Sequence, residues 1–361
     1  MRVLFMAPLL PPITGHTLVS EALKEGLAAR HDIDTVDLGR DSSSDGSVTR
    51  ARLKATAVLL RDVWRQRGRF DAAYLTVAES LAGNLKDLAI YSLCLGKLDR
   101  TVIHLHGGSI GHLLFDRRPW LRRINRWFIA RLRGVIISGP SHRAIFDGMI
   151  DPSRVHEIPN FAPESLFIDP AAIERKHADA TRLRVLYISG MTALKGYADL
   201  LDAYLALTEA ERNCVQLDFA GRFDDEGARA EFEARIAAAP GVRYHGVVDH
   251  AAKRALFGQA HVFCLPSRHL EGQPISILEG YAAGCVVSCT VPPGVRDIFI
   301  PGTNGWALEP GEPRSITAAL REMLGAPARL GEIARRNRAT AESQYRLSTF
   351  VESVNAVLIH G

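Results

Sequence analysis

The chain has 361 residues, of which 47% are hydrophobic, so it can bury a large core and is long enough for two domains. Its apolar runs fall well short of the ~18 residues of a membrane span, and no basic, cleavable signal peptide is visible at the N-terminus. The five cysteines show no CxxC spacing, which favours reduced, buried thiols in the cytoplasm over disulfides or structural zinc.

Charge is unevenly distributed along the chain, although the net charge is only +4. Residues 1–160 contain 23 Lys and Arg against 16 Asp and Glu, whereas residues 161–361 contain 21 against 24. This asymmetry indicates an anionic partner for the first half of the chain. Nucleic acid is not favoured as that partner, because no nucleic-acid-binding module is recognisable and the second half is acidic.

Short runs rich in apolar and β-branched residues alternate with helical segments along the whole chain. We expect strands at 3–10, 32–38, 72–78, 101–107, 134–138 and 155–159 in the first half, and at 184–190, 215–221, 242–248, 261–266, 285–290 and 305–310 in the second. Continuous apolar strands between helices predict parallel sheets covered on both faces, hence an α/β protein with two Rossmann-like, doubly wound halves.

The first expected strand is followed by PPITGHTLVSEAL, whose single glycine is Gly15. A nicotinamide dinucleotide domain would carry GxGxxG at this point, so the sequence argues against a Rossmann dehydrogenase. A lone glycine before a helix permits a phosphate or sugar to approach the backbone closely, and it is equally compatible with a simple turn.

The fourth expected strand ends in HLHGG, which brings His104, His106 and Gly107 to the carboxyl end of a strand. Because strand side chains alternate between the two faces, His104 and His106 share a face. Such a pair could bind a metal ion, but the sequence suggests no third ligand. We therefore favour a metal-free ligand site at His106.

The second half opens with YISGMTALKG, in which a strand ends at Gly190 and a loop carries Lys195 to the start of a helix. A lysine at the mouth of such a loop can neutralise a diphosphate as a point charge. Arg222, in a later strand-to-helix turn, could assist it. The alternative is that Lys195 lies in an ordinary surface turn.

Residues 271–284, EGQPISILEGYAAG, carry two carboxylates, Glu271 and Glu279, between two expected strands. In α/β folds, ligands bind at the carboxyl ends of strands, where helix N-termini face anions. A carboxylate there can accept paired hydrogen bonds from the vicinal hydroxyls of a sugar. The alternative is a solvated loop glutamate followed by a glutamate that the helix dipole favours.

The segment EGQPISILEGYAAGCVV (271–287) resembles the two-glutamate signature of the retaining, GT-B-fold glycosyltransferases of family 4, also called glycosyltransferase group 1. The resemblance implies two Rossmann-like domains facing each other across a cleft, with the last helix crossing back to the N-terminal domain. It also implies that Glu271 lies at the donor sugar and that Glu279 binds the nucleotide ribose. His106 resembles the family histidine beside the donor sugar, and Lys195 the family lysine at the diphosphate.

Carried over residue by residue, the resemblance implies catalytic roles for Glu271, His106 and Lys195. Met191 stands where the family has an arginine, so one expected phosphate contact is missing. The positions that the resemblance assigns to donor binding are Gly15, Gly107, Gly190, Lys195, Arg222, Gly272, Gln273, Pro274, Ile275, Ser276 and Glu279.

The implied reaction is the transfer of a hexose from a nucleotide-diphosphate sugar to an acceptor hydroxyl, with retention and without metal or cofactor, in polysaccharide or glycolipid biosynthesis. Residues 1–165, with part of the final helix (345–361), are expected to bind the acceptor and residues 183–344 the donor. Residues 166–182, rich in polar side chains, are expected to link them. The alternatives are a sugar-nucleotide epimerase of the same fold, or a non-catalytic nucleotide-sugar-binding or membrane scaffold protein.

Two basic amphipathic stretches lie in the first half, at 50–69 and 117–133, and both contain Trp among several Arg. Trp and Arg together on a helix suit an anionic membrane surface. We therefore expect a peripheral enzyme at the inner face of the cytoplasmic membrane, with a lipid-linked or saccharide acceptor. The alternative is an ordinary helix with a solvated basic face.

Overall fold

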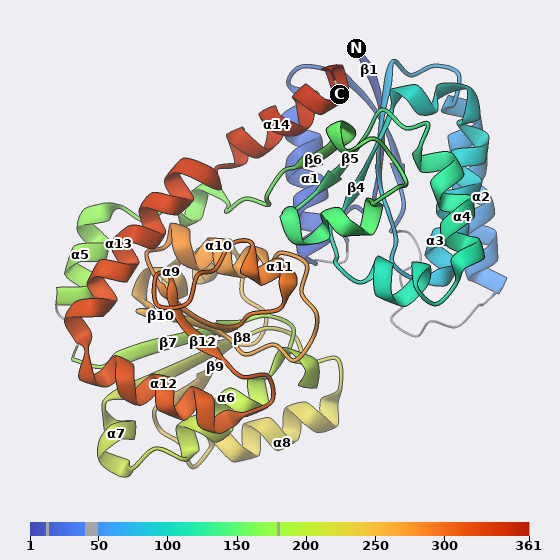
Figure 1. Cartoon of the computed structure of the whole chain (residues 1–361). Helices are drawn as coiled ribbons and strands as arrows, with labels where there is room; N and C mark the ends of the chain where they lie inside the picture. Colours follow the sequence, from blue (N-terminus) through green and yellow to red (C-terminus); the bar gives the residue numbers. More distant parts are fainter. Residues whose placement is uncertain (12–13, 40–49, 179–180, 361) are drawn as a thin grey trace. The chain divides into compact units, whose positions relative to one another are not determined.

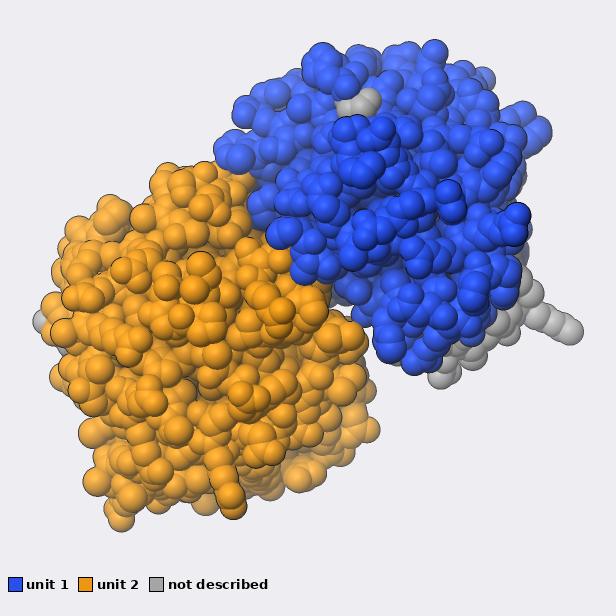
Figure 2. All heavy atoms as spheres, in the orientation of Figure 1, with its two compact units in different colours: residues 1–160, 347–361 blue, residues 161–346 orange. Residues whose placement is uncertain are grey.

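The computed structural model describes residues 1–11, 14–39, 50–178 and 181–360. The chain forms two compact units, residues 1–160 with 347–361 and residues 161–346 (Figure 2). Within the described residues, each unit contains one six-stranded parallel sheet with helices packed on it (Figure 1). The expected α/β architecture of two Rossmann-like, doubly wound halves is therefore confirmed.

The first unit's sheet has its most apolar strands in the middle and its more exposed strands at the edges. The strand order is β2-β1-β3-β4-β5-β6. Every residue of β3, β4 and β5 is buried, whereas β2 and β6 at the edges are partly exposed. The strands are β1 (Arg2–Ala7), β2 (Asp32–Asp37), β3 (Ala72–Thr76), β4 (Thr101–Leu105), β5 (Gly134–Ile137) and β6 (Val155–Glu157).

Two groups of helices cover this sheet. In Figure 1, α2, α3 and α4 lie together on one side of it, and α1 and α14 lie on the other. The helices are α1 (Gly15–Ala28), α2 (Arg50–Gln66), α3 (Leu81–Leu93), α4 (Pro119–Ile129) and α14 (Leu347–His360). Shorter helical turns lie at Leu95–Arg100, Gly111–Phe115, Pro140–Phe146 and Pro152–Arg154.

The final helix belongs to the first unit although the rest of the C-terminal half does not. Helix α14 packs against α1, β3 and β4, and its apolar side chains Phe350, Val354 and Leu358 are buried there. Burial of one apolar face explains why this helix docks on the first sheet rather than extending into solvent. The expectation that the last helix crosses back to the N-terminal domain is confirmed.

The second unit's sheet has the strand order β12-β11-β10-β7-β8-β9. As in the first unit, the central strands β10 and β11 are wholly buried, and the edge strand β9 is partly exposed. The strands are β7 (Leu183–Ile188), β8 (Val215–Ala220), β9 (Val242–Tyr244), β10 (Val262–Leu265), β11 (Val286–Thr290) and β12 (Gly305–Leu308). All the strands expected from the sequence are therefore present.

The helices of the second unit connect these strands and end in a long segment that leads to α14. They are α5 (Pro170–Ala178), α6 (Tyr197–Leu205), α7 (Glu209–Asn213), α8 (Glu226–Ile236), α9 (His250–Gln259), α10 (Ile275–Ala282), α11 (Pro293–Arg296), α12 (Pro313–Gly325) and α13 (Pro327–Gln344). Single helical turns lie at Glu164–Leu166 and Ala193–Lys195.

The segment 166–182, expected as a linker, contains α5 and packs within the second unit. Helix α5 lies against α13, and its Ile173 side chain is buried beside Gly284, two residues before β11. The polar composition of the segment concealed a helix that buries only a narrow apolar stripe. The change from the first unit to the second falls between Asn160 and Phe161.

The direction of strand progression reverses once in each sheet. In the second unit the reversal lies between the neighbouring strands β7 and β10, and in the first between β1 and β3. Loops that leave the carboxyl ends of strands on either side of such a reversal diverge and leave room for a ligand. The loops at 189–196 and 266–274 leave β7 and β10 at this point.

Candidate functional site

Lys195 and Glu271 meet at the strand reversal of the second unit. Lys195 lies in the loop after β7 and Glu271 in the loop after β10, and Lys195 Nζ is 2.6 Å from Glu271 Oε1. The Ser267 hydroxyl donates to the same carboxylate oxygen at 2.7 Å. The structure thus joins two residues that are 76 positions apart in the sequence and that were singled out separately.

Backbone contacts hold these two loops together. The carbonyl oxygen of Leu194 accepts from the backbone N–H of Arg268 at 2.7 Å and from the Ser267 hydroxyl at 3.3 Å. Arg268 in turn forms a two-pronged ion pair with the buried carboxylate of Asp199 in the first turn of α6. Gly196 has a φ of +75°, and a Cβ there would lie 2.0 Å from the Pro266 carbonyl oxygen, so only glycine fits. The Lys195 loop is therefore fixed rather than free.

The loop from Glu271 leads into α10 with a helix N-terminus that no side chain caps. Pro274 is the N-cap residue and makes no side-chain hydrogen bond, and Ile275 and Ser276 begin the helix. Gly294 packs directly against the backbone of Gly272. A Cβ at Gly294 would lie 1.5 Å from the Gly272 carbonyl oxygen, so glycine is required at 294. The N–H groups at the start of α10 can therefore bind an anion that lies close to Glu271 and Lys195.

Glu279 lies on α10 and is paired with a residue that the sequence analysis did not identify. Its side chain is only 3% exposed and forms an ion pair with Lys253 in the first turn of α9. Helices α9 and α10 both begin at the carboxyl edge of the sheet, where Glu271 also lies, and Glu279 is the fifth residue of α10. A ribose can reach the Glu279 carboxylate only if Lys253 turns aside or shares it.

The position that carries arginine in the resembling family is structurally different here. Met191 is buried in the hydrophobic core, and its backbone N–H donates to the carbonyl oxygen of Arg222 at 2.9 Å. The Arg222 side chain is 72% exposed and pairs only loosely with Asp224, at 3.4 Å. Gly190 is exposed at the end of β7. Met191 therefore provides no positive charge at the Gly190 loop, whereas the Arg222 side chain does provide one beside it.

The remaining predicted residues lie in the first unit, at the carboxyl ends of β1 and β4. Gly15 is the first residue of α1, and His106 and Gly107 follow β4. The ring centroid of His16, next to Gly15, lies 4.4 Å from that of His106. A Cβ at Gly107 would lie 1.9 Å from a carboxylate oxygen of Glu79, so glycine is required there.

A cavity of about 360 Å³ opens beside these residues. Glu79 fixes one wall, because it accepts hydrogen bonds from the backbone N–H groups of Ser109 and Ile110 at 2.5 and 2.9 Å. Burial lowers the pKa of His16 to about 4 and that of His106 well below its ordinary value. The cavity is lined by Pro8, His16, Leu38, Thr76, Val77, Ala78, Glu79, Ser80, Lys86, His106 and Gly107.

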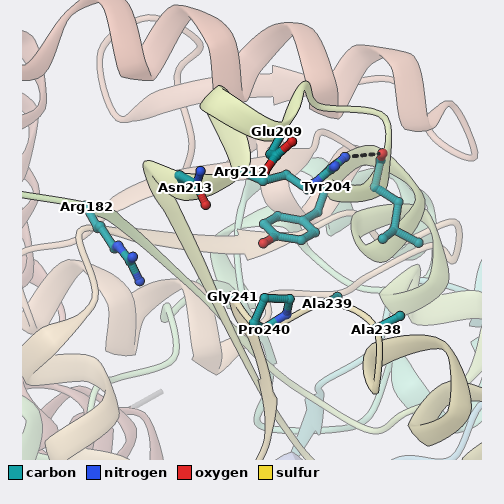
Figure 3. Close-up of a pocket in the computed structure, with 10 residues that line it drawn as sticks. Arg182, Tyr204, Glu209, Arg212, Asn213, Ala238, Ala239, Pro240 and Gly241 are labelled. Carbon is teal, nitrogen blue, oxygen red and sulfur yellow. Dashed lines mark hydrogen bonds between the residues drawn. The ribbon is translucent and has the colours of Figure 1, made fainter.

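A second cavity, of about 390 Å³, lies in the second unit and involves none of the predicted residues. Tyr204, Arg182 and Arg212 are among the residues that line it (Figure 3). The Arg212 guanidinium is occupied by the carbonyl oxygens of Leu205 and Leu207. Because its lining residues precede β7 and β9 or follow α6, it opens at the amino ends of the strands, away from the Lys195–Glu271 pair.

The described residues offer neither a metal site nor a disulfide. In the described part of the chain, no group of three or more His, Cys, Asp or Glu side chains is placed to hold a metal ion. Cys94, Cys264, Cys285 and Cys289 are buried free thiols, and Cys214 is exposed. Burial raises the pKa of Cys94 to about 11. The described helices include none long and apolar enough to cross a bilayer.

The sequence analysis singled out the loop residues described above, and it missed several residues that contact them or lie close to them. The missed residues are separated from the motifs along the chain and lie outside any recognisable pattern. Only His16 had a sequence signal, since it follows Gly15. The missed residues are His16, Tyr74, Glu79 and Lys86 in the first unit and Asp199, Lys253, Ser267 and Arg268 in the second.

Two six-stranded parallel sheets in separate Rossmann-like units are the architecture of the GT-B fold. Residues 170–341 match the family described as Glycosyl transferases group 1. This match covers just under half of the chain and lies within the second unit, where the sequence resemblance is also found.

Comparisons with individual proteins agree with this family. The chain is 23% identical over 190 residues to the amylovoran biosynthesis glycosyltransferase AmsK of Erwinia amylovora, a match that spans 49% of this chain and 45% of AmsK. Among solved structures, HepE of Anabaena in complex with UDP superimposes with a TM-score of 0.75 and 17% identity, over 99% of this chain and 100% of HepE. Sucrose-phosphate synthase from Thermosynechococcus elongatus superimposes with a TM-score of 0.74 and 14% identity, over 99% of this chain and 98% of the synthase. These likenesses establish the GT-B fold.

Proposed function

We propose that the protein transfers a hexose from a nucleotide-diphosphate sugar to an acceptor hydroxyl with retention at the anomeric carbon. The observation that carries this proposal is the Lys195–Glu271 pair at the strand reversal, beside the uncapped N-terminus of α10. It brings together a cation for a diphosphate, a carboxylate for sugar hydroxyls and backbone N–H groups for phosphate oxygens. In the reaction, the bond from C1 to the phosphate oxygen breaks, a bond from C1 to the acceptor oxygen forms, and the acceptor proton passes to the leaving phosphate.

The catalytic contribution of the second unit is electrostatic. Negative charge develops on the leaving diphosphate as the glycosidic bond breaks, and fixed positive groups lower the energy of that state. Lys195 supplies one charge, Arg222 supplies a second where Met191 supplies none, and the N-terminus of α10 adds partial positive charge. These groups take the part that a metal ion has in other folds, so we propose a metal-independent reaction.

We propose a uridine diphosphate sugar as the donor class to test first. Support comes from HepE of Anabaena, whose structures include complexes with UDP and with UDP-glucose. Glu271 would bind the sugar, with Gly272, Gln273 and Pro274 shaping the loop, and Glu279 the ribose. His106 and Gly107 line the cavity of the first unit, which we propose holds a sugar of the substrate. The name of AmsK supports a role in polysaccharide biosynthesis.

Product analysis tests the reaction. The purified protein is incubated with UDP-, GDP- and ADP-sugars and with lipid-linked and soluble saccharide acceptors, with and without excess EDTA, and products are identified by mass spectrometry and anomeric configuration. We expect an α- or β-linkage that matches the donor, at a rate that EDTA does not change. Release of nucleotide and epimerised sugar without acceptor product would instead support an epimerase. Donor binding without turnover of any sugar would support a scaffold protein.

We propose further that α4 and the preceding helical turn Gly111–Phe115 carry a membrane-binding surface, which we define as Leu113, Trp120, Arg123, Ile124 and Trp127. Trp120 and Trp127 are 56% and 47% exposed, and Ile124 lies between them at helical spacing. The Arg131 guanidinium lies 3.9 Å from the Trp127 ring centroid. Exposed tryptophans flanked by arginines bind the interface of an anionic bilayer.

The second basic stretch contributes a similar feature on α2. Trp64 is exposed there, and the guanidinium of Arg67 lies 3.1 Å from its ring centroid. Helices α2 and α4 both pack against α3, so they cover the same side of the first sheet (Figure 1). An anionic cytoplasmic leaflet at this side would bring a lipid-linked acceptor to the first unit, and the protein would be a peripheral membrane enzyme.

Co-sedimentation with vesicles of rising anionic lipid content tests this surface at low and high salt. Each Arg near an anionic surface contributes about 1 kcal/mol, so several give reversible attachment that salt weakens. The Trp120→Ser/Trp127→Ser and Arg123→Glu/Arg126→Glu variants should lose binding. Arg335→Glu/Arg336→Glu, in the second unit, is the matched control and should bind normally. Wild-type protein that stays in the supernatant at every composition would show that the acceptor is reached without a membrane.

A further inference from the structure

The side chain of His106 lies in a cluster of aromatic rings that the proposed reaction does not by itself explain. The ring centroid of His104, on β4, is 3.9 Å from that of His106, and the centroid of His16, on α1, is 4.4 Å from it. Tyr74 of β3 lies beside both strand histidines and stacks on Phe5 of β1, with centroids 4.9 Å apart. Three elements of the first unit, α1, β3 and β4, therefore place a ring beside the His106 imidazole, and β1 supports the Tyr74 ring.

The Tyr74 hydroxyl connects the two histidines of β4 by hydrogen bonds. Its oxygen lies 2.7 Å from His104 Nδ1 and 3.4 Å from His106 Nε2. A phenol has one hydrogen, so it can donate to only one of these nitrogens, and the other nitrogen must donate to the phenol oxygen. The contact to His104 is the shorter and therefore the stronger of the two, so we assign the phenol hydrogen to it. Tyr74 therefore donates to His104, and His106 donates to Tyr74.

We infer that Tyr74 and His104 are positioning residues that hold His106 in one neutral tautomer, with Nε2 protonated and the lone pair of Nδ1 available to a substrate hydroxyl. This inference rests on the proposed function, in which His106 faces the sugar from the cavity of the first unit. An imidazole fixed in one tautomer accepts a hydrogen bond from a sugar hydroxyl without first reorganising.

The surroundings of His106 keep it uncharged over the range in which histidine ordinarily titrates. The groups that face it are His16 from α1, Tyr74 from β3 and His104 from β4, and the Glu79 carboxylate packs against the adjacent Gly107. Burial lowers the pKa of His104 to about 3, and Lys86 on α3 adds to the lowering of the His16 pKa. Burial opposes protonation of each of the three imidazoles. A positive charge on one of them would in addition oppose protonation of its neighbours, because the rings lie so close together.

Nitrogen NMR of protein labelled with ¹⁵N-histidine tests the inference without reference to activity. His106 signals are assigned by their absence in His106→Asn. In wild-type protein we expect a neutral His106 with Nε2 protonated and no titration between about pH 5.5 and 8, given its burial. In Tyr74→Phe, which keeps the ring and its stacking on Phe5, we expect a mixture of the two tautomers. His106 that titrates normally, that carries its proton on Nδ1, or that is unchanged by Tyr74→Phe would overturn the inference.

Kinetics provide the second readout once a donor and acceptor are known. Tyr74→Phe should lower kcat about tenfold, the effect of losing one neutral hydrogen bond, with less change in the donor KM. His104→Asn, whose side-chain oxygen can still accept from Tyr74, should retain more of kcat than His104→Leu. Tyr91→Phe removes the hydroxyl of another buried tyrosine of the same unit and should change neither readout. Equal losses in His104→Asn and His104→Leu would overturn the positioning role.

Discussion

Replacing Glu271 by Gln should tighten nucleotide binding while lowering turnover, because Glu271 holds Lys195 in the free protein. The Lys195 ammonium lies 2.6 Å from Glu271 Oε1 and must leave that carboxylate to contact a diphosphate. A partly exposed pair of this kind contributes about 1 kcal/mol or less. Removing the charge at Glu271 should therefore strengthen binding of a free nucleoside diphosphate by up to about fivefold. Turnover should fall, since the sugar loses a carboxylate partner.

Lys195→Met should have the opposite effect on binding. It removes a charge-assisted contact to the diphosphate that is worth about 1.5–3 kcal/mol, less the energy needed to open the ion pair. The expected outcome is nucleotide binding that is weaker by about tenfold. The double variant should bind like Lys195→Met alone, because without the ammonium the charge at Glu271 no longer competes with the diphosphate for it.

Isothermal titration calorimetry with UDP at fixed ionic strength measures all four proteins of this cycle. Arg335→Met is the matched control, since it removes an exposed cation of the same unit that is paired with Glu174. Its affinity should equal that of the wild type. The reasoning would be refuted if Glu271→Gln weakened UDP binding tenfold while Lys195→Met left it unchanged.

Three further predictions follow from other contacts. Glu279→Ala should weaken UDP binding at least tenfold in a folded protein, because hydrogen bonds from ribose hydroxyls to a carboxylate contribute about 1.5–3 kcal/mol each; unchanged calorimetric affinity would remove Glu279 from the nucleotide site. Lys253→Met leaves the Glu279 carboxylate buried without its cation, and should lower the free energy of unfolding by about 2–3 kcal/mol in urea titrations, with Glu279→Gln restoring part of the loss. Burial lowers the pKa of His104 to about 3, so its stabilising contribution is present above the unfolded pKa near 6.5 and is lost as the pH falls below it. Wild-type protein should accordingly lose about 2 kcal/mol more stability than His104→Asn between pH 7.5 and 5, and parallel losses would contradict this.

The fold class could be predicted from the sequence, because the composition of a short segment by itself indicates whether a strand is buried on one face or on both. Runs such as those at 3–10 and 261–266 are apolar without alternation, and a strand of that kind is stable only when helices cover both faces of its sheet. The candidate loop at 271–284 could be proposed for a related reason. Its two glutamates, its proline and the following helix are contiguous, and the carboxyl end of a buried strand is where α/β folds place ligands. The composition of residues 166–182 did not predict helix α5 there, because this helix buries only one narrow stripe of apolar side chains.

The tertiary structure alone decided which side chains share a site. Tyr74 and His104 are 30 residues apart, and Lys253 and Glu279 are 26 apart, with no spacing that marks either pair. The first pair forms because β3 and β4 are neighbours in a register that places Thr76 opposite His104, so Tyr74 lies on the same face one step away. The second forms because α9 and α10 begin at the same edge of the second sheet. Strand order and register are fixed by long-range packing of the whole core, and a single stretch of sequence does not contain that information.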